Sequence, residues 1–138
     1  MNVFLDANIL VSVLNKEFPL FNYTSRILSL NPQKFKLYTS PICLAIAFYF
    51  AEKKSGAKLA KTKIELLIQH IHIAEANREG VLLAAQNKAI EDFEDGLEYY
   101  AALHSHCSSI LTENVKDFYF SEIEVLDAEG FLEQYFGM

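Results

Sequence analysis

The sequence has few of the residues that build a disulfide scaffold or a membrane span. Only two cysteines occur, Cys43 and Cys107, each in an apolar stretch. No disulfide framework or cysteine-built metal site is therefore expected, and a reducing, cytoplasmic location is favoured. The longest apolar run, residues 42–51, has ten residues, about half of what a membrane helix needs. Residues 1–6 reach an acid too early for a signal peptide. No membrane association is expected.

The chain also lacks internal repeats, low-complexity tracts and linkers, which predicts a single domain over residues 1–138. Half of it (51%) is apolar and 13% is aromatic, which excludes global disorder. The net charge of −6 argues against a protein that coats nucleic acid through bulk electrostatics.

The charges are distributed unevenly along the chain. Twelve of the eighteen acids follow residue 90, where Lys116 is the only base. Five of the ten lysines form one short basic segment: Lys53, Lys54, Lys58, Lys61 and Lys63. Such lysines form either a solvated helix face or a surface for the nucleic-acid backbone.

Short apolar strands alternate with helices along the chain. The strands are predicted at residues 2–5, 36–39, 72–74, 108–111 and 124–126. Helices are predicted at residues 8–14, 22–30, 41–54, 56–71, 78–89, 92–104 and 128–136. This alternation is typical of an α/β fold with a mostly parallel sheet. The helix after Ser40 has no polar stripe around its middle, so we expect it to be buried on nearly all sides.

An acid directly follows the first predicted strand, in the motif Asp6-Ala-Asn8. Apolar surroundings penalise a charge, so an aspartate at this place needs a reason. It either caps the following helix or faces a metal ion or a phosphate group.

Two further motifs carry acids near the ends of predicted elements. Asp92 and Asp95 lie three residues apart at the start of a helix and hence on one face; taken alone, they are a capped helix start. Thr112, Asn114 and Asp117 follow a later strand and, taken alone, form a turn that caps a short helix. Because groups beyond the carboxyl ends of parallel strands share one edge of the sheet, these acids can converge with the first motif.

In their order and separation, the three motifs resemble the PIN-domain nucleases, particularly the VapC-type toxins of toxin–antitoxin pairs. The matching segments are Phe-Leu-Asp6-Ala-Asn8-Ile-Leu, Asp92-Phe-Glu-Asp95-Gly-Leu and Ile-Leu-Thr112-Glu-Asn114-Val-Lys-Asp117-Phe118. The segment that begins at Glu124 is similar to the family's last strand and helix. The resemblance spans essentially the whole chain, and the ordered set is more specific than any one motif.

The resemblance implies a Rossmann-like α/β/α sandwich and a Mg²⁺- or Mn²⁺-dependent endoribonuclease. By this resemblance, the catalytic and metal-binding acids are Asp6, Asp95 and Asp117. The supporting residues are Asn8, Asp92, Thr112 and Asn114. The chemistry is consistent, because hard divalent cations prefer oxygen ligands and can activate a water for attack on a phosphodiester.

The partners implied are an RNA substrate, whose backbone the basic segment (Lys53, Lys54, Lys58, Lys61 and Lys63) contacts, and a protein antitoxin. The resemblance also leaves room for a homodimer.

One departure from the family concerns the helix after Ser40-Pro41. Family members usually carry a glutamate on this helix, at a position that here falls near Ile46. Glu52 lies about 9 Å further along the axis and about 240° around it, so it cannot substitute. We expect weaker metal binding, or an acid supplied from elsewhere, such as Asp92.

Two alternative functions remain at this point. The missing glutamate favours a PIN-fold module that binds RNA or a protein partner without cleaving. Alternatively, a strand followed by Asp6-x-Asn8 superficially resembles the start of the haloacid dehalogenase phosphotransferases, with Asp6 as a nucleophile. The chain lacks the later acid pair and the length that this second alternative requires.

Overall fold

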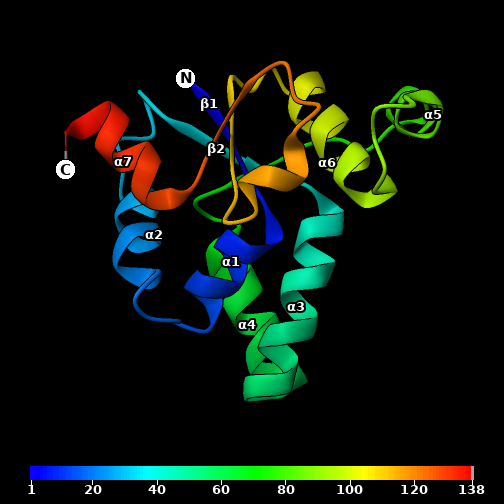
Figure 1. Ribbon diagram of the computed structural model, residues 1–138. Coiled ribbons are helices and arrows are strands. Elements are labelled where there is room, and N and C mark those ends of the chain that lie inside the picture. The colour runs from blue at the N-terminus through cyan, green and yellow to red at the C-terminus, as the bar shows by residue number, and fades with distance from the viewer. Residues whose placement is uncertain (138) are drawn as a thin grey trace.

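A five-stranded parallel sheet forms the centre of the molecule (Figure 1) in the computed structural model, which describes residues 1–137. The strands are β1 (Asn2–Leu5), β2 (Lys36–Thr39), β3 (His72–Ile73), β4 (Ser109–Leu111) and β5 (Glu124–Leu126). Their order across the sheet is β3-β2-β1-β4-β5, and every pair of neighbours is parallel. The predicted α/β class is confirmed.

The central strands β1 and β4 are mainly apolar because helices cover both of their faces. Val3, Phe4 and Leu5 of β1 are fully buried, as are Ile110 and Leu111 of β4. These side chains form the middle of the hydrophobic core. The register pairs Leu5 with Leu111, so β1 and β4 end side by side.

The helices form two groups around the sheet. They are α1 (Ala7–Leu14), α2 (Phe21–Leu28), α3 (Pro41–Ser55), α4 (Ala57–Leu67), α5 (Arg78–Gln86), α6 (Phe93–His104) and α7 (Ala128–Phe136), with a 3₁₀ turn, η1 (Val115–Phe118). The first four pack on one another and α7 packs on α2, whereas α5 packs on α6. The chain runs from β1 outward to β3 and then returns across the sheet to β4. Because connections between parallel strands are right-handed as a rule, this reversal puts the two groups on opposite faces.

The expectation that α3 is buried on nearly all sides is wrong. Cys43, Ala47 and Ala51 are buried, but Tyr49 is 52% exposed and Phe50 is 45% exposed. The reason is length. Fifteen helical residues extend about 22 Å, whereas a four-residue strand spans about 13 Å, so α3 and α4 project beyond the sheet (Figure 1).

Among residues 1–137, no helix combines the length and the apolar character required to cross a membrane.

Candidate active site

A cavity of about 480 Å³ lies beyond the carboxyl ends of β1 and β4. The strand order changes direction at this point of the sheet, which is where open α/β folds bind ligands. The cavity is lined by polar residues and by a few apolar ones: Asp6, Ala7, Asn8, Val11, Glu17, Leu20, Ile46, Phe50, Asp92, Glu94, Asp95, Glu98, Glu113, Asn114 and Asp117. Three elements distant in the sequence thus bring Asp6, Asp95 and Asp117 to one cavity.

Asp6 both caps α1 and faces the cavity. Its backbone N–H donates to Leu111 O (3.0 Å), which ties the end of β1 to β4. Its Oδ1 accepts from Ala7 N (2.6 Å) at the helix start. Its Oδ2 accepts from Thr112 Oγ1 (2.7 Å). The side chain is only 7% exposed, so the carboxylate is held in one orientation.

A polar network fixes the loop after β4 against the start of α1. The Asn8 amide donates to Thr112 Oγ1 (3.1 Å), and Asn8 Oδ1 accepts from Glu113 N (3.1 Å). Thr112 is fully buried, and its hydroxyl also accepts from Asn114 N (3.1 Å). The turn predicted around Thr112 and Asn114 therefore forms, and it positions the Asp6 carboxylate.

The start of α6 carries the next acids. Asp92 is the N-cap of this helix and accepts from Glu94 N (2.9 Å), at the exposed rim of the cavity. Asp95 is half-buried one turn further on. Burial, followed by the nearby negative charges of Asp92, Asp6, Asp117 and Glu94, raises the pKa of Asp95 to about 7. Acids from three elements therefore repel one another here.

Asp117 reaches the cavity from η1, where its side chain is exposed. Asn114 is the N-cap residue of η1, although its side chain makes no capping hydrogen bond, and it lines the same cavity. Of the seven residues that the sequence indicates for the site, all but Thr112 line the cavity. Thr112 lies directly behind Asp6, to which it is hydrogen-bonded.

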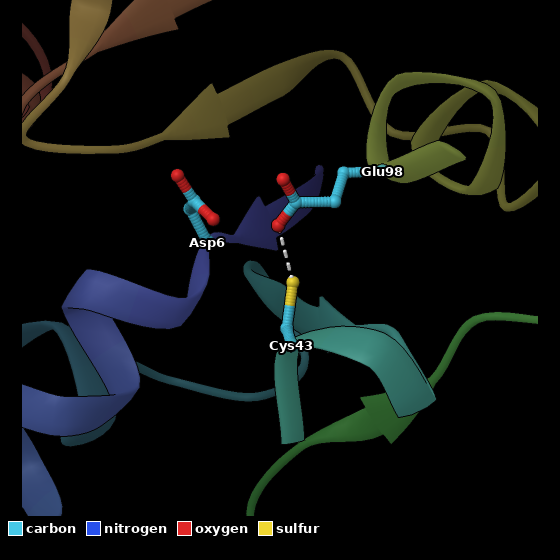
Figure 2. Close-up of side chains that lie close together, drawn as sticks. All are labelled: Asp6, Cys43 and Glu98. Carbon is cyan, nitrogen blue, oxygen red and sulfur yellow. Dashed lines mark hydrogen bonds between the residues drawn. The ribbon is translucent and has the colours of Figure 1, made fainter. Parts of the chain in front are cut away.

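Glu98 is a site residue that sequence reasoning missed. It lies on α6, one turn after Asp95, with 1% of its surface exposed. The Cys43 thiol of α3 donates to Glu98 Oε1 (2.6 Å), and Figure 2 shows the Glu98 carboxyl group reaching from α6 toward Asp6 and Cys43. Burial, and then a hydrogen bond with Asp6, raises the pKa of Glu98 to about 10. The carboxyl group is therefore neutral near pH 7.

A signal for Glu98 is present in the sequence. Asp92, Asp95 and Glu98 follow one another at intervals of three residues, which places all three on one helix face. The neighbours of Glu98 in the sequence, Leu97, Tyr99 and Tyr100, are apolar or aromatic. The helical periodicity therefore predicts that this part of the helix faces the core.

The basic segment lies away from the cavity, at the end of α3 and along α4. None of the residues that line the cavity, in the part of the chain described, is basic. Three of the five lysines have partners within the molecule. Lys54 Nζ donates to Asn15 O, Lys63 Nζ donates to Ser55 Oγ, and Lys53 Nζ lies 4.6 Å from the centre of the Tyr49 ring.

The residues around the cavity fit a hard divalent cation. Carboxylates are the ligands that Mg²⁺ and Mn²⁺ prefer. A cation would offset the desolvation and the mutual repulsion that together raise the pKa of Asp95. Asp6, Asp95 and Asp117 all line this cavity.

Comparison with known proteins gives the family. A family model described as "PIN domain" matches residues 2–116, and the chain belongs to this family. The chain is 32% identical over 139 residues to "Ribonuclease VapC1" of Aquifex aeolicus (strain VF5), in a match that covers 96% of this chain and 94% of the relative. The resemblance to VapC-type proteins is thus confirmed.

Solved structures show the same fold. The structure of VapBC2 from Rickettsia felis bound to a promoter DNA fragment matches with a TM-score of 0.73 and 19% identity, over 91% of this chain and 97% of that one. VapBC-1 from nontypeable Haemophilus influenzae matches with a TM-score of 0.69 and 22% identity, over 94% and 99% of the two chains. The predicted PIN-like α/β/α sandwich is confirmed.

Proposed function

We propose that this protein is the VapC-like toxin of a toxin–antitoxin pair, a divalent-metal-dependent endoribonuclease that uses Mg²⁺ or Mn²⁺. The observation that carries the proposal is the arrival of Asp6, Asp95 and Asp117 from three elements at one cavity. The match to a relative named as a ribonuclease over nearly the whole chain supports the RNA substrate.

The roles of the chain's own residues follow from their places. Asp6, Asp95 and Asp117 would bind the cation, which when bound lowers the pKa of a water and neutralises charge on the phosphate. Asn8 and Thr112 hold Asp6 in orientation through the hydrogen bonds described above. Asn114 and Asp92 line the cavity wall and rim, where they would orient water or substrate.

Metal removal tests the proposal directly. In Mn²⁺ the wild type is expected to cut a structured RNA, because a cation is needed to offset the carboxylate charge that otherwise repels phosphate. Excess chelator should abolish cutting, and added Mn²⁺ or Mg²⁺ should restore it. Gel analysis of end-labelled RNA measures this. Cleavage that persists at full rate in chelator would contradict the proposal.

The basic segment is expected to supply RNA affinity that depends on salt and not on sequence. Lys58 and Lys61 are exposed. Replacing both with Gln should weaken RNA binding and flatten its dependence on log salt by about 1–2 units. Fluorescence anisotropy at several salt concentrations measures this. The matched control is Lys34→Gln with Lys36→Gln, which removes the same charge elsewhere. Equal effects of the two pairs would mean that the basic segment is only a solvated face.

A protein antitoxin is part of the proposal, because two structural neighbours are VapBC structures and a third is a toxin–antitoxin complex from Klebsiella pneumoniae. Residues of α3 and α4 line an apolar groove that is available for such a partner: Leu44, Ala45, Phe48, Lys61, Ile64 and Glu65. Homodimerisation and a cytoplasmic location stay predictions; light scattering on the purified chain checks the former.

A second candidate function is a PIN module that binds RNA without cleaving it. The observation that favours it is the apolar side chain of Ile46 in the cavity wall, where family members usually carry a glutamate. RNA binding by a wild type that does not cut in Mn²⁺ would make this the better description.

A further inference from the structure

The cavity has an apolar side chain on the wall that α3 forms. Ile46 lines the cavity, and the only acid of α3, Glu52, is exposed and does not line it. Asp92, on the opposite wall, is at the exposed rim and accepts a hydrogen bond from its own helix. The place next to α3 is therefore open to a carboxylate from another element.

Glu98 reaches α3 from α6 and lines the same cavity as Ile46. Its Oε1 accepts from Cys43 Sγ at 2.6 Å, so its carboxyl group touches the cavity-facing side of α3. Cys43 precedes Ile46 by three residues, which puts the two on one helix face about 4.5 Å apart along the axis. The Glu98 carboxyl thus lies beside the position from which a glutamate at 46 would enter the cavity.

The carboxyl group of Glu98 lies close both to Asp6, at the end of β1, and to Asp95, at the start of α6. Single ligand atoms of Asp6, Cys43 and Glu98 lie within 4.8 Å of one another, and so do those of Glu94, Asp95 and Glu98. Glu98 is the member common to both groups. A cation held near the end of β1 and the start of α6 would therefore have this carboxylate within reach (Figure 2).

Packing alone does not account for an acid at this place. A carboxyl group that is 1% exposed loses nearly all of its hydration, and an apolar side chain would avoid that penalty. The residue of α3 that Glu98 contacts, Cys43, is small and buried, which leaves room for the longer side chain. The fold thus admits a buried carboxyl group at the cavity.

We propose that Glu98 is a metal-binding carboxylate of this protein and that it takes the place of the glutamate that is missing at Ile46. The inference rests on the proposed metal-dependent function. With Glu98, the proposed metal site has four carboxylates. The fourth comes from α6, one turn after Asp95, and not from α3.

Mn²⁺ binding, measured by the loss of the electron paramagnetic resonance signal of the free ion, tests the inference without any RNA. Glu98→Gln keeps the size and hydrogen-bonding capacity of the side chain, and it should weaken Mn²⁺ binding by about tenfold or more. Glu52→Gln, which removes the one acid of α3, should bind as the wild type does. Adding Ile46→Glu to Glu98→Gln should restore much of the lost affinity, because it returns the carboxylate to the same place from α3.

The outcomes separate this inference from the proposed function. A wild type that binds no Mn²⁺ would overturn both. If the wild type binds Mn²⁺ and Asp6→Asn does not, while Glu98→Gln binds as tightly as the wild type, this inference alone is overturned. A folded double variant that stays as weak as Glu98→Gln would show that Glu98 does not replace a carboxylate at position 46. Folding of each variant is checked by circular dichroism and by its melting temperature.

Discussion

Asp95→Asn is expected to lower the rate of RNA cleavage by about two to three orders of magnitude while leaving RNA binding intact. The substitution keeps the shape of the side chain and removes one negative charge. Catalysis should fall because a carboxylate that would position the cation is gone. Binding should be unchanged, or tighter in chelator, because one of the charges that repel phosphate has been removed. Single-turnover cleavage in Mn²⁺ and anisotropy in chelator measure the two effects.

A matched control removes a carboxylate of the same kind outside the cavity. Asp127 caps α7, where its Oδ1 accepts from Gly130 N (2.6 Å). Asparagine caps helices nearly as well as aspartate, so Asp127→Asn should fold normally and cleave RNA as the wild type does. If Asp95→Asn and the wild type leave the same residual cutting, a contaminating nuclease is the source, and the module that binds without cleaving becomes the better description.

Hydrophobic periodicity was sufficient to predict the sheet and most helices. The strand at residues 2–5 is a continuous apolar run that ends in an acid, and such runs are typical of a strand buried on both faces. Parallel strands then bring groups that follow β1 and β4 to one edge. This is why Asp6 and Asp117 could be predicted to meet although they are more than a hundred residues apart in the chain.

Glu98 and the exposure of α3 could not be predicted in the same way, because both depend on tertiary packing. Periodicity gives the face of a helix that a residue occupies, but not what lies opposite. Glu98 contacts Cys43 because α6 and α3 lie close together in the folded chain, which the sequence pattern does not indicate. Likewise, the apolar run of α3 suggests burial, yet half of Tyr49 is in solvent because the helix extends beyond the short strands.

The stability of the metal-free protein is expected to fall as the pH rises from 5 to 8. Glu98 has a pKa of about 10 in the folded chain, against an ordinary value of 4.5, and Asp95 has a pKa of about 7, against 3.8. Between the two values of each group, the folded state holds a proton that the unfolded state has lost. The stability that each group contributes is therefore fully present below its unfolded value and is lost as the pH rises toward the folded one. The buried Glu98 carboxyl contributes a slope of up to about 1.4 kcal/mol per pH unit, and the half-buried Asp95 contributes less because solvent screens the charges around it.

Glu98→Gln isolates the contribution of this carboxyl group. Glutamine imitates the neutral acid, so the variant should be more stable than the wild type at pH 8 in chelator, and its pH dependence should be shallower. Mn²⁺ should reverse the order, because it stabilises the folded wild type in place of the proton. Urea unfolding at pH 5 and pH 8, with chelator or with Mn²⁺, measures both effects, and Glu52→Gln should follow the wild type throughout. A wild type whose metal-free stability is constant or increases over this range would contradict the raised pKa values. A Glu98→Gln variant that gains as much stability from Mn²⁺ as the wild type would show that the cation binds without Glu98.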